Sequence, residues 1–111
     1  MSDIPAIRRQ LKIKAGVVKR LGKECNLYKK EAGDQRRKLD KFIADGAEDW
    51  DINNGTRMME ESDKMITDSA NRLGKAVGEL RDLIVEAKKE LGLAGDQELL
   101  EAEKVLQEAG V

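Results

Sequence analysis

The sequence lacks the residues on which many catalytic and disulfide-linked proteins depend. Its 111 residues include no histidine and a single cysteine, Cys25. Without histidine the chain has neither the usual proton shuttle nor the commonest neutral metal ligand, and one cysteine cannot form an internal disulfide. Cys25 falls on an apolar helix position, so we interpret it as a core residue instead of a nucleophile. We therefore expect no catalytic residue, no metal site and no cofactor.

Long apolar segments, proline and aromatic residues are also scarce. No apolar run approaches the roughly 20 residues of a membrane-spanning helix, and the first residues do not resemble a secretory signal. We therefore expect no membrane association, and the single cysteine suits a reducing, cytoplasmic location. One proline and 3% aromatic residues favour a helical unit with a narrow aliphatic core over a sheet domain.

The first half of the chain contains a long heptad pattern. Asp3 is a candidate N-cap, and Gly46 after Asp45 is a candidate left-handed C-cap, so the pattern predicts a helix over about 4–45. Mostly apolar or small residues recur at steps of four and three, at Ile7, Leu11, Lys14, Val18, Leu21, Cys25, Tyr28, Ala32, Gln35, Leu39 and Phe42.

A second heptad pattern predicts a helix over about 51–91, with Gly92 as its stop. A shorter third helix over about 96–109 is expected to bury Leu99, Ala102, Leu106 and Ala109. The seam of the second helix consists of Ile52, Thr56, Met59, Asp63, Ile66, Ala70, Leu73, Val77, Leu80, Ile84, Ala87 and Leu91.

These helices predict an all-α, elongated antiparallel three-helix bundle that forms a single domain over 1–111, because short connections fold helices back on one another. The third helix is long enough to cover only the open end. The first two helices should therefore carry extra apolar or small residues there, at Ala6, Ile13, Val17, Gly74, Gly78 and Val85.

Charge is distributed unevenly along the chain. Residues 1–46 carry thirteen Lys or Arg against six Asp or Glu, whereas the remainder carries eight against sixteen. Pairing of a basic helix with an acidic one explains this pattern, and a remaining basic face could also steer an acidic partner. Nucleic-acid binding is not expected, because the basic residues are dispersed and aromatic residues for base stacking are missing.

One segment partly matches a calcium-binding EF-hand loop. Asp49, Asp51, Asn53 and Glu60 occupy its first, third, fifth and twelfth places, but Asn54 stands where that loop requires glycine. The heptad pattern also continues through the segment. We therefore interpret these residues as the acidic start of the second helix.

Three segments resemble the tubulin-binding cofactor A family. Residues 11–21, with 23–24 and 28–32, resemble the family's first helix, and 48–52 resembles its acidic turn with an aromatic residue. Residues 61–73 resemble its motif in the second helix, although Lys64, Thr67 and Ser69 replace a Met, a Pro and a Cys. Without that proline, the sequence does not decide whether this helix is kinked.

The resemblance implies a chaperone that binds β-tubulin after the cytosolic chaperonin and passes it on for αβ-heterodimer assembly, with other tubulin-folding cofactors involved indirectly. It also implies a cytoplasmic, cytoskeleton-associated protein that is not an enzyme. Basic residues in the matching motif could steer acidic tubulin, and two methionines seven residues apart could supply adaptable apolar contact. The candidate binding residues are Lys12, Lys19, Arg20, Lys23, Met58, Glu61, Met65 and Arg72.

Two other interpretations of the helical pattern remain open: a spectrin-like scaffold repeat and a coiled-coil adaptor that self-associates. A spectrin-like repeat would need three helices of similar length, and the third predicted helix is much shorter than the others. The sequence is compatible with either a monomer or a homodimer.

Overall fold

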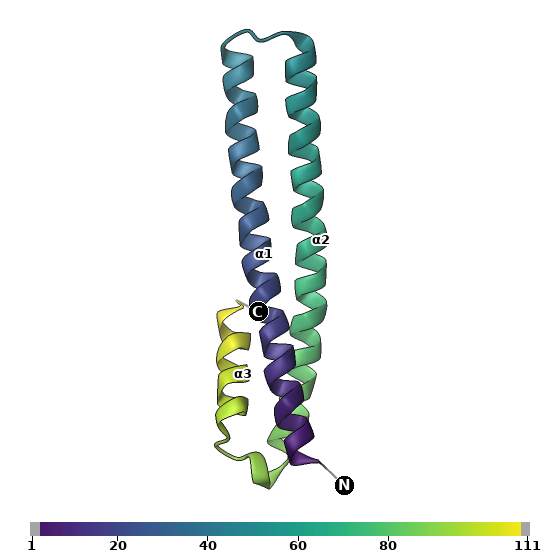
Figure 1. Cartoon of the computed structure of the whole chain (residues 1–111), viewed down its shortest axis with the longest axis vertical. Helices are drawn as coiled ribbons and strands as arrows, with labels where there is room; N and C mark the ends of the chain where they lie inside the picture. Colours follow the sequence, from purple (N-terminus) through teal and green to yellow (C-terminus); the bar gives the residue numbers. More distant parts are fainter. Residues whose placement is uncertain (1–2, 110–111) are drawn as a thin grey trace. The chain divides into compact units, whose positions relative to one another are not determined.

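The computed structural model describes residues 3–109, which form the helices α1 (Ile4–Ala44), α2 (Asp49–Lys88) and α3 (Gln97–Glu108) and the 3-10 turn η1 (Leu91–Leu93) (Figure 1). The predicted all-α class and the order of two long helices and a short third one are confirmed. The chain forms two compact units. The first unit extends up to Gly22 and resumes at Arg72, and the second is Lys23–Asn71.

Both predicted ends of α1 are confirmed by hydrogen bonds. The Asp3 carboxylate accepts a bond of 3.2 Å from the backbone N–H of Ala6, which is an N-cap. At the other end Gly46 has φ +69°. Its N–H donates to the carbonyl of Ile43 (3.2 Å), and the N–H of Ala47 donates to that of Phe42 (2.9 Å). This is the Schellman arrangement, which reverses the chain into α2.

Replacing glycine by alanine should have opposite effects at Gly46 and Gly74. Gly46→Ala forces a side chain into the left-handed region and should destabilise by about 1–2 kcal/mol. Gly74 is exposed inside α2, and an added Cβ would meet no atom within 4 Å. Gly74→Ala should therefore stabilise by about 1 kcal/mol. Urea unfolding of both variants measures these changes. A shift of both midpoints in one direction would contradict the different roles given to Gly46 and Gly74.

All three helices contribute to the core of the first unit. Small residues at the helix contacts, such as Ala15, Ala87 and Ala102, bring the backbones close. The buried side chains are Leu11, Ala15, Val18, Ala76, Val77, Leu80, Ile84, Ala87, Leu93, Leu99, Ala102 and Val105.

Several residues of α1 and α2 that were predicted to contact α3 do not form its contact surface. Ile13 and Val85 are 51% and 53% exposed, and an added Cβ on Gly74 or Gly78 would meet nothing within 4 Å. Instead, α3 lies over the side of α1 that carries Ala15, where a cavity is lined by both helices. The buried alanine lets α3 approach, so the apolar residues on other sides of α1 remain partly in solvent.

The end of α2 also differs from the prediction. The helix stops at Lys88, and the next N–H groups donate to carbonyls three residues back, which tightens the chain into η1. Leu91 is consequently 92% exposed, and Leu93 enters the core in its place. Gly92 is not a left-handed stop: in the connection between α2 and α3 the glycine with positive φ is Gly95. Gly92 instead leaves room for the Ile4 side chain, which an added Cβ would meet.

The second unit, Lys23–Asn71, has only two helical segments and a thinner core. Its buried residues include Cys25, Leu39, Gly55 and Ser69. An added Cβ on Gly55 would lie 3.3 Å from Leu39 Cδ1, so the helices approach closely there. The predicted seam residues Asp63 and Ala70 are exposed, because small residues at 55, 62 and 69 face α1 instead.

Hydroxyl groups of α2 form hydrogen bonds with its own backbone in this unit. Thr56 donates to the carbonyl of Ile52 (2.9 Å) and Ser62 to that of Met58 (3.1 Å). The hydroxyls of Thr67 and Ser69 likewise donate to carbonyls about one turn earlier, at 3.2 and 2.9 Å. The fully buried Ser69 hydroxyl is therefore satisfied without a partner on α1.

Candidate functional site

A groove of about 470 Å³ lies between α1 and α2 within the second unit. We call it the Met groove, because two predicted binding residues, Met58 and Met65, line it together with a third, Glu61. Both methionines are about 40% exposed. Its lining consists of Tyr28, Glu31 and Gln35 of α1 and Met58, Glu61, Ser62, Lys64, Met65 and Asp68 of α2.

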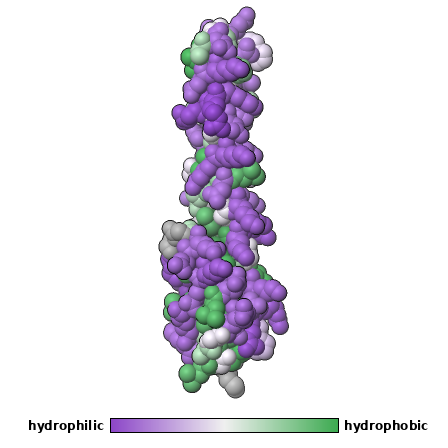
Figure 2. All heavy atoms as spheres, turned by 90° about the vertical axis from the view of Figure 1, so that its left-hand side faces the viewer, coloured by the Kyte–Doolittle hydropathy of each residue, from purple (hydrophilic) through white to green (hydrophobic). Residues whose placement is uncertain are grey.

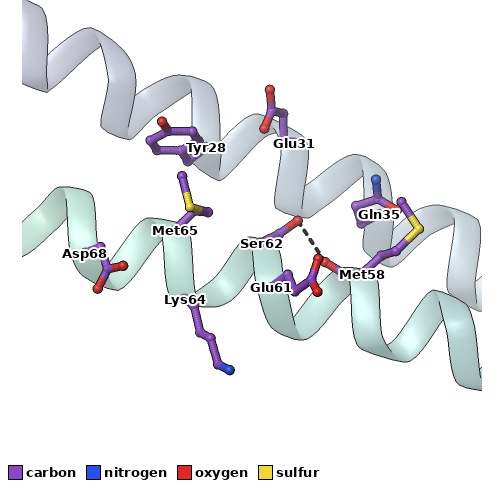
Figure 3. A pocket seen from close by; sticks show the side chains of 9 residues that line it. All are labelled: Tyr28, Glu31, Gln35, Met58, Glu61, Ser62, Lys64, Met65 and Asp68. Atoms are coloured by element: carbon purple, nitrogen blue, oxygen red, sulfur yellow. Dashed lines mark hydrogen bonds between the residues drawn. The ribbon is translucent and has the colours of Figure 1, made fainter.

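The heptad spacing of both helices accounts for the groove. Tyr28 and Gln35 are seven apart on α1, as are Met58 and Met65 on α2, so each pair lies on one side of its helix. Figure 3 shows Tyr28 and Met65 pointing toward one another and Gln35 beside Met58. The small Ser62 between the methionines leaves the space open. The heptad pattern alone placed Tyr28 and Gln35 in the core and did not identify them as groove residues.

The Met groove combines an apolar interior with an acidic border. The phenol ring and the two thioethers supply the apolar surface, and Glu31, Glu61 and Asp68 are exposed carboxylates around it. Lys64 is the one basic residue that lines the groove, and its side chain points away from α1 (Figure 3). The groove is therefore suited to apolar side chains accompanied by positive charge.

The predicted basic binding residues are all exposed but differ in their surroundings. In the first unit the Lys19 ammonium lies 3.9 Å from a Glu101 carboxylate oxygen of α3. Lys12 and Lys19 line a cavity of about 290 Å³ together with acids of that helix. Arg20 of α1 and Arg72 of α2 are also exposed in this unit, whereas Lys23 belongs to the second unit. The predicted residues thus fall in both units.

On the surface shown in Figure 2, hydrophilic side chains predominate and hydrophobic atoms appear in separate patches. No helix within residues 3–109 is long and apolar enough to cross a membrane. Within the same range, no three Cys, Asp or Glu residues come together in a way that could hold a metal ion. The residues that resemble a calcium loop lie in α2, which begins at Asp49, and Cys25 is 4% exposed.

Asp96 is the residue whose ionisation is most clearly tied to the fold. Its carboxylate accepts a hydrogen bond of 2.6 Å from the guanidinium of Arg8 and another of 3.0 Å from the backbone N–H of Glu98. The Arg8 hydrogen bond, and secondarily that N–H, lower the pKa of Asp96 below its ordinary value. The ionised side chain thus caps α3 and connects it to α1.

Because the pKa of Asp96 is lower in the folded state, its contribution to stability should be present at neutral pH and lost as pH falls through the folded pKa. Asp96→Asn retains a capping side chain but removes the charge, so its melting temperature should be below that of the wild type at pH 7, and the difference should be smaller at pH 3. Asp96→Ala also removes the cap and should remain lower at both pH values. An equal deficit of the Asn variant at both values would contradict this role.

Two helical units that are each compact, a groove and exposed charged faces define a small α-helical protein suited to binding another macromolecule. A family model described as "Tubulin binding cofactor A" matches residues 6–106. Tubulin-specific chaperone A of Gallus gallus is 42% identical over 99 residues, which cover 89% of both proteins. The chain belongs to the tubulin binding cofactor A family.

Solved structures agree with this assignment. A structure of human tubulin chaperone cofactor A has a TM-score of 0.79 and 37% identity, covering 95% of this chain and 99% of its own. The crystal structure of tubulin folding cofactor A from Arabidopsis thaliana has a TM-score of 0.85 and 29% identity, covering 95% and 96%. The predicted family and fold are therefore confirmed.

Proposed function

We propose that this protein is a tubulin-folding chaperone that binds β-tubulin after its release from the cytosolic chaperonin and passes it on for αβ-heterodimer assembly. The observation that carries the proposal is the family match over residues 6–106. Relatives named tubulin-specific chaperone A, which match over 88–89% of both chains, support it. The protein would act as a single domain, by binding alone and without a cofactor. It would do so in the cytoplasm, in association with the cytoskeleton. Other tubulin-folding cofactors would be indirect partners.

Two kinds of surface support β-tubulin binding in this proposal. The exposed cations Lys12, Lys19, Arg20, Lys23 and Arg72 would attract the acidic client and raise the association rate. The methionines and Glu61 of the Met groove would provide the short-range contact, since thioethers adapt to differently shaped partners.

Co-migration in size-exclusion chromatography tests the proposal directly. The purified protein is mixed with β-tubulin or α-tubulin at low and moderate salt, and its own elution reports whether it is a monomer or a homodimer. A complex with β-tubulin but not α-tubulin is expected. No complex with either, under conditions in which circular dichroism shows the protein folded, would favour the adaptor or scaffold interpretation.

A further inference from the structure

The first unit shows how this fold completes a helix pair with a third, oppositely charged helix. Its α3 buries Leu99, Ala102 and Val105 against α1 and α2. Carboxylates along α3 face cations of the long helices: Glu101 lies 3.9 Å from Lys19, and Glu103 lies 3.3 Å from Lys88. An acidic amphipathic helix thus covers a helix pair with basic side chains.

The second unit has no third helix among its residues 23–71, and its groove has the opposite charge. The apolar surface of Tyr28, Met58 and Met65 stays open, with Glu31, Glu61 and Asp68 around it. We propose that the Met groove binds one basic amphipathic helix of a partner protein, which takes the place that α3 has in the first unit. If the proposed function holds, this helix belongs to β-tubulin.

The dimensions of the groove match two turns of such a helix. Met58 and Met65 are seven residues apart, which is about 10 Å along α2 at a rise of 1.5 Å per residue. Two apolar residues of the partner, also seven apart, would therefore reach both methionines. The volume of about 470 Å³ accommodates such anchors. Lysine or arginine beside the anchors would face the three carboxylates, and unbranched methionines adapt to the anchors' shape.

Two synthetic helical peptides test whether the Met groove prefers a basic amphipathic helix. Both carry leucines seven residues apart, and the flanking residues are Lys and Arg in one peptide and Glu in the other. We expect the basic peptide to bind at least about tenfold more tightly in fluorescence anisotropy at low salt. Methyl NMR should show shifts at Met58 and Met65 and little change at Met59, which does not line the groove. Equal binding of the two peptides, or shifts confined to other methyl groups, would overturn the proposal.

Adjacent residues of α2 provide a matched pair of variants. Glu61 lines the groove and Glu60 does not, although both are exposed. Glu61→Lys should weaken binding of the basic peptide by about tenfold, whereas Glu60→Lys, with the same change in net charge, should weaken it by less than about twofold. Equal losses of affinity in the two variants would show that only net charge matters and would overturn the assignment of the Met groove as the binding site.

Co-migration with tubulin and peptide binding, measured on the same purified protein, distinguish failure of the groove assignment from failure of the proposed function. Co-migration with β-tubulin but no preference for the basic peptide would overturn the groove assignment and leave the chaperone function intact. Preference for the basic peptide at Met58 and Met65 without β-tubulin binding would support the groove chemistry and overturn the proposed client.

Discussion

Replacing Leu80 by alanine is expected to lower the free energy of unfolding by about 2–5 kcal/mol. The Leu80 side chain is fully buried and belongs to the cluster that joins α1, α2 and α3. Truncation removes apolar contacts and leaves a cavity that close-packed neighbours fill only partly. Since a domain of this size is stable by about 5–15 kcal/mol, this one change would remove a large fraction of its stability.

Leu100→Ala is the matched control, because Leu100 of α3 is 56% exposed. Its effect should stay within about 0.5 kcal/mol. Urea denaturation followed by circular dichroism measures both variants. A loss below 1 kcal/mol for Leu80→Ala, or equal losses for the two variants, would show that this cluster does not hold the first unit together.

If the proposed function holds, the second large effect is expected on the rate of β-tubulin binding. Reversing Arg20 and Lys23 to glutamate should slow association about tenfold or more at low ionic strength, because charge steering changes association rates by about 10–10³. The difference from the wild type should shrink as salt screens the charges. Stopped-flow fluorescence of labelled tubulin at several salt concentrations measures this. Both residues are exposed in α1, so the substitutions leave the core unchanged.

Lys19 is a less suitable target, because reversal would place a carboxylate beside Glu101 and disturb α3 as well as binding. The matched control reverses Arg36 and Lys38, which are exposed on the same helix but lie outside the first-helix motif of residues 11–32. If the control slows association as much as Arg20→Glu with Lys23→Glu, net charge alone controls the rate. A rate that does not depend on salt would exclude electrostatic steering.

Sequence periodicity predicted the two long helices well, because their apolar residues repeat over many turns. The hairpin was predictable for a local reason: Gly46 follows the last turn of α1, and its positive φ needs only the backbone of that turn. The end of α2 depends on a distant contact, since Gly92 makes room for Ile4 from the start of the chain. Local sequence therefore assigned Gly92 the wrong role and Leu91 the wrong environment.

Heptad analysis could not decide which of two adjacent residues on α2 faces α1. In the second unit Ser69, and not Ala70, is buried, although alanine is the more apolar residue. Its hydroxyl is satisfied within α2, so burial leaves no unpaired group. In the first unit both Ala76 and Val77 are buried, and Ala76 lines a cavity together with Ile13 and Val17 of α1.

The candidate site was predictable only in part. Met58 and Met65 were recognisable as a pair from their spacing, and the structure places both in one groove with Glu61. Tyr28 was assigned to the core because its heptad position is correct for burial, and its contribution to the groove depends on the small size of Ser62 across the interface. The pairing of Lys19 with Glu101 required knowledge of where α3 packs.

The four hydroxyls that bond to carbonyls within α2 also affect its mechanics. Serine and threonine side chains bonded in this way compete with backbone hydrogen bonds and often bend helices. Between Thr56 and Ser69, we therefore expect α2 to bend more easily than a helix of alanine and leucine would. Because this stretch forms one wall of the Met groove, a bound helix can be accommodated by elastic bending of that wall as well as by side-chain rotation.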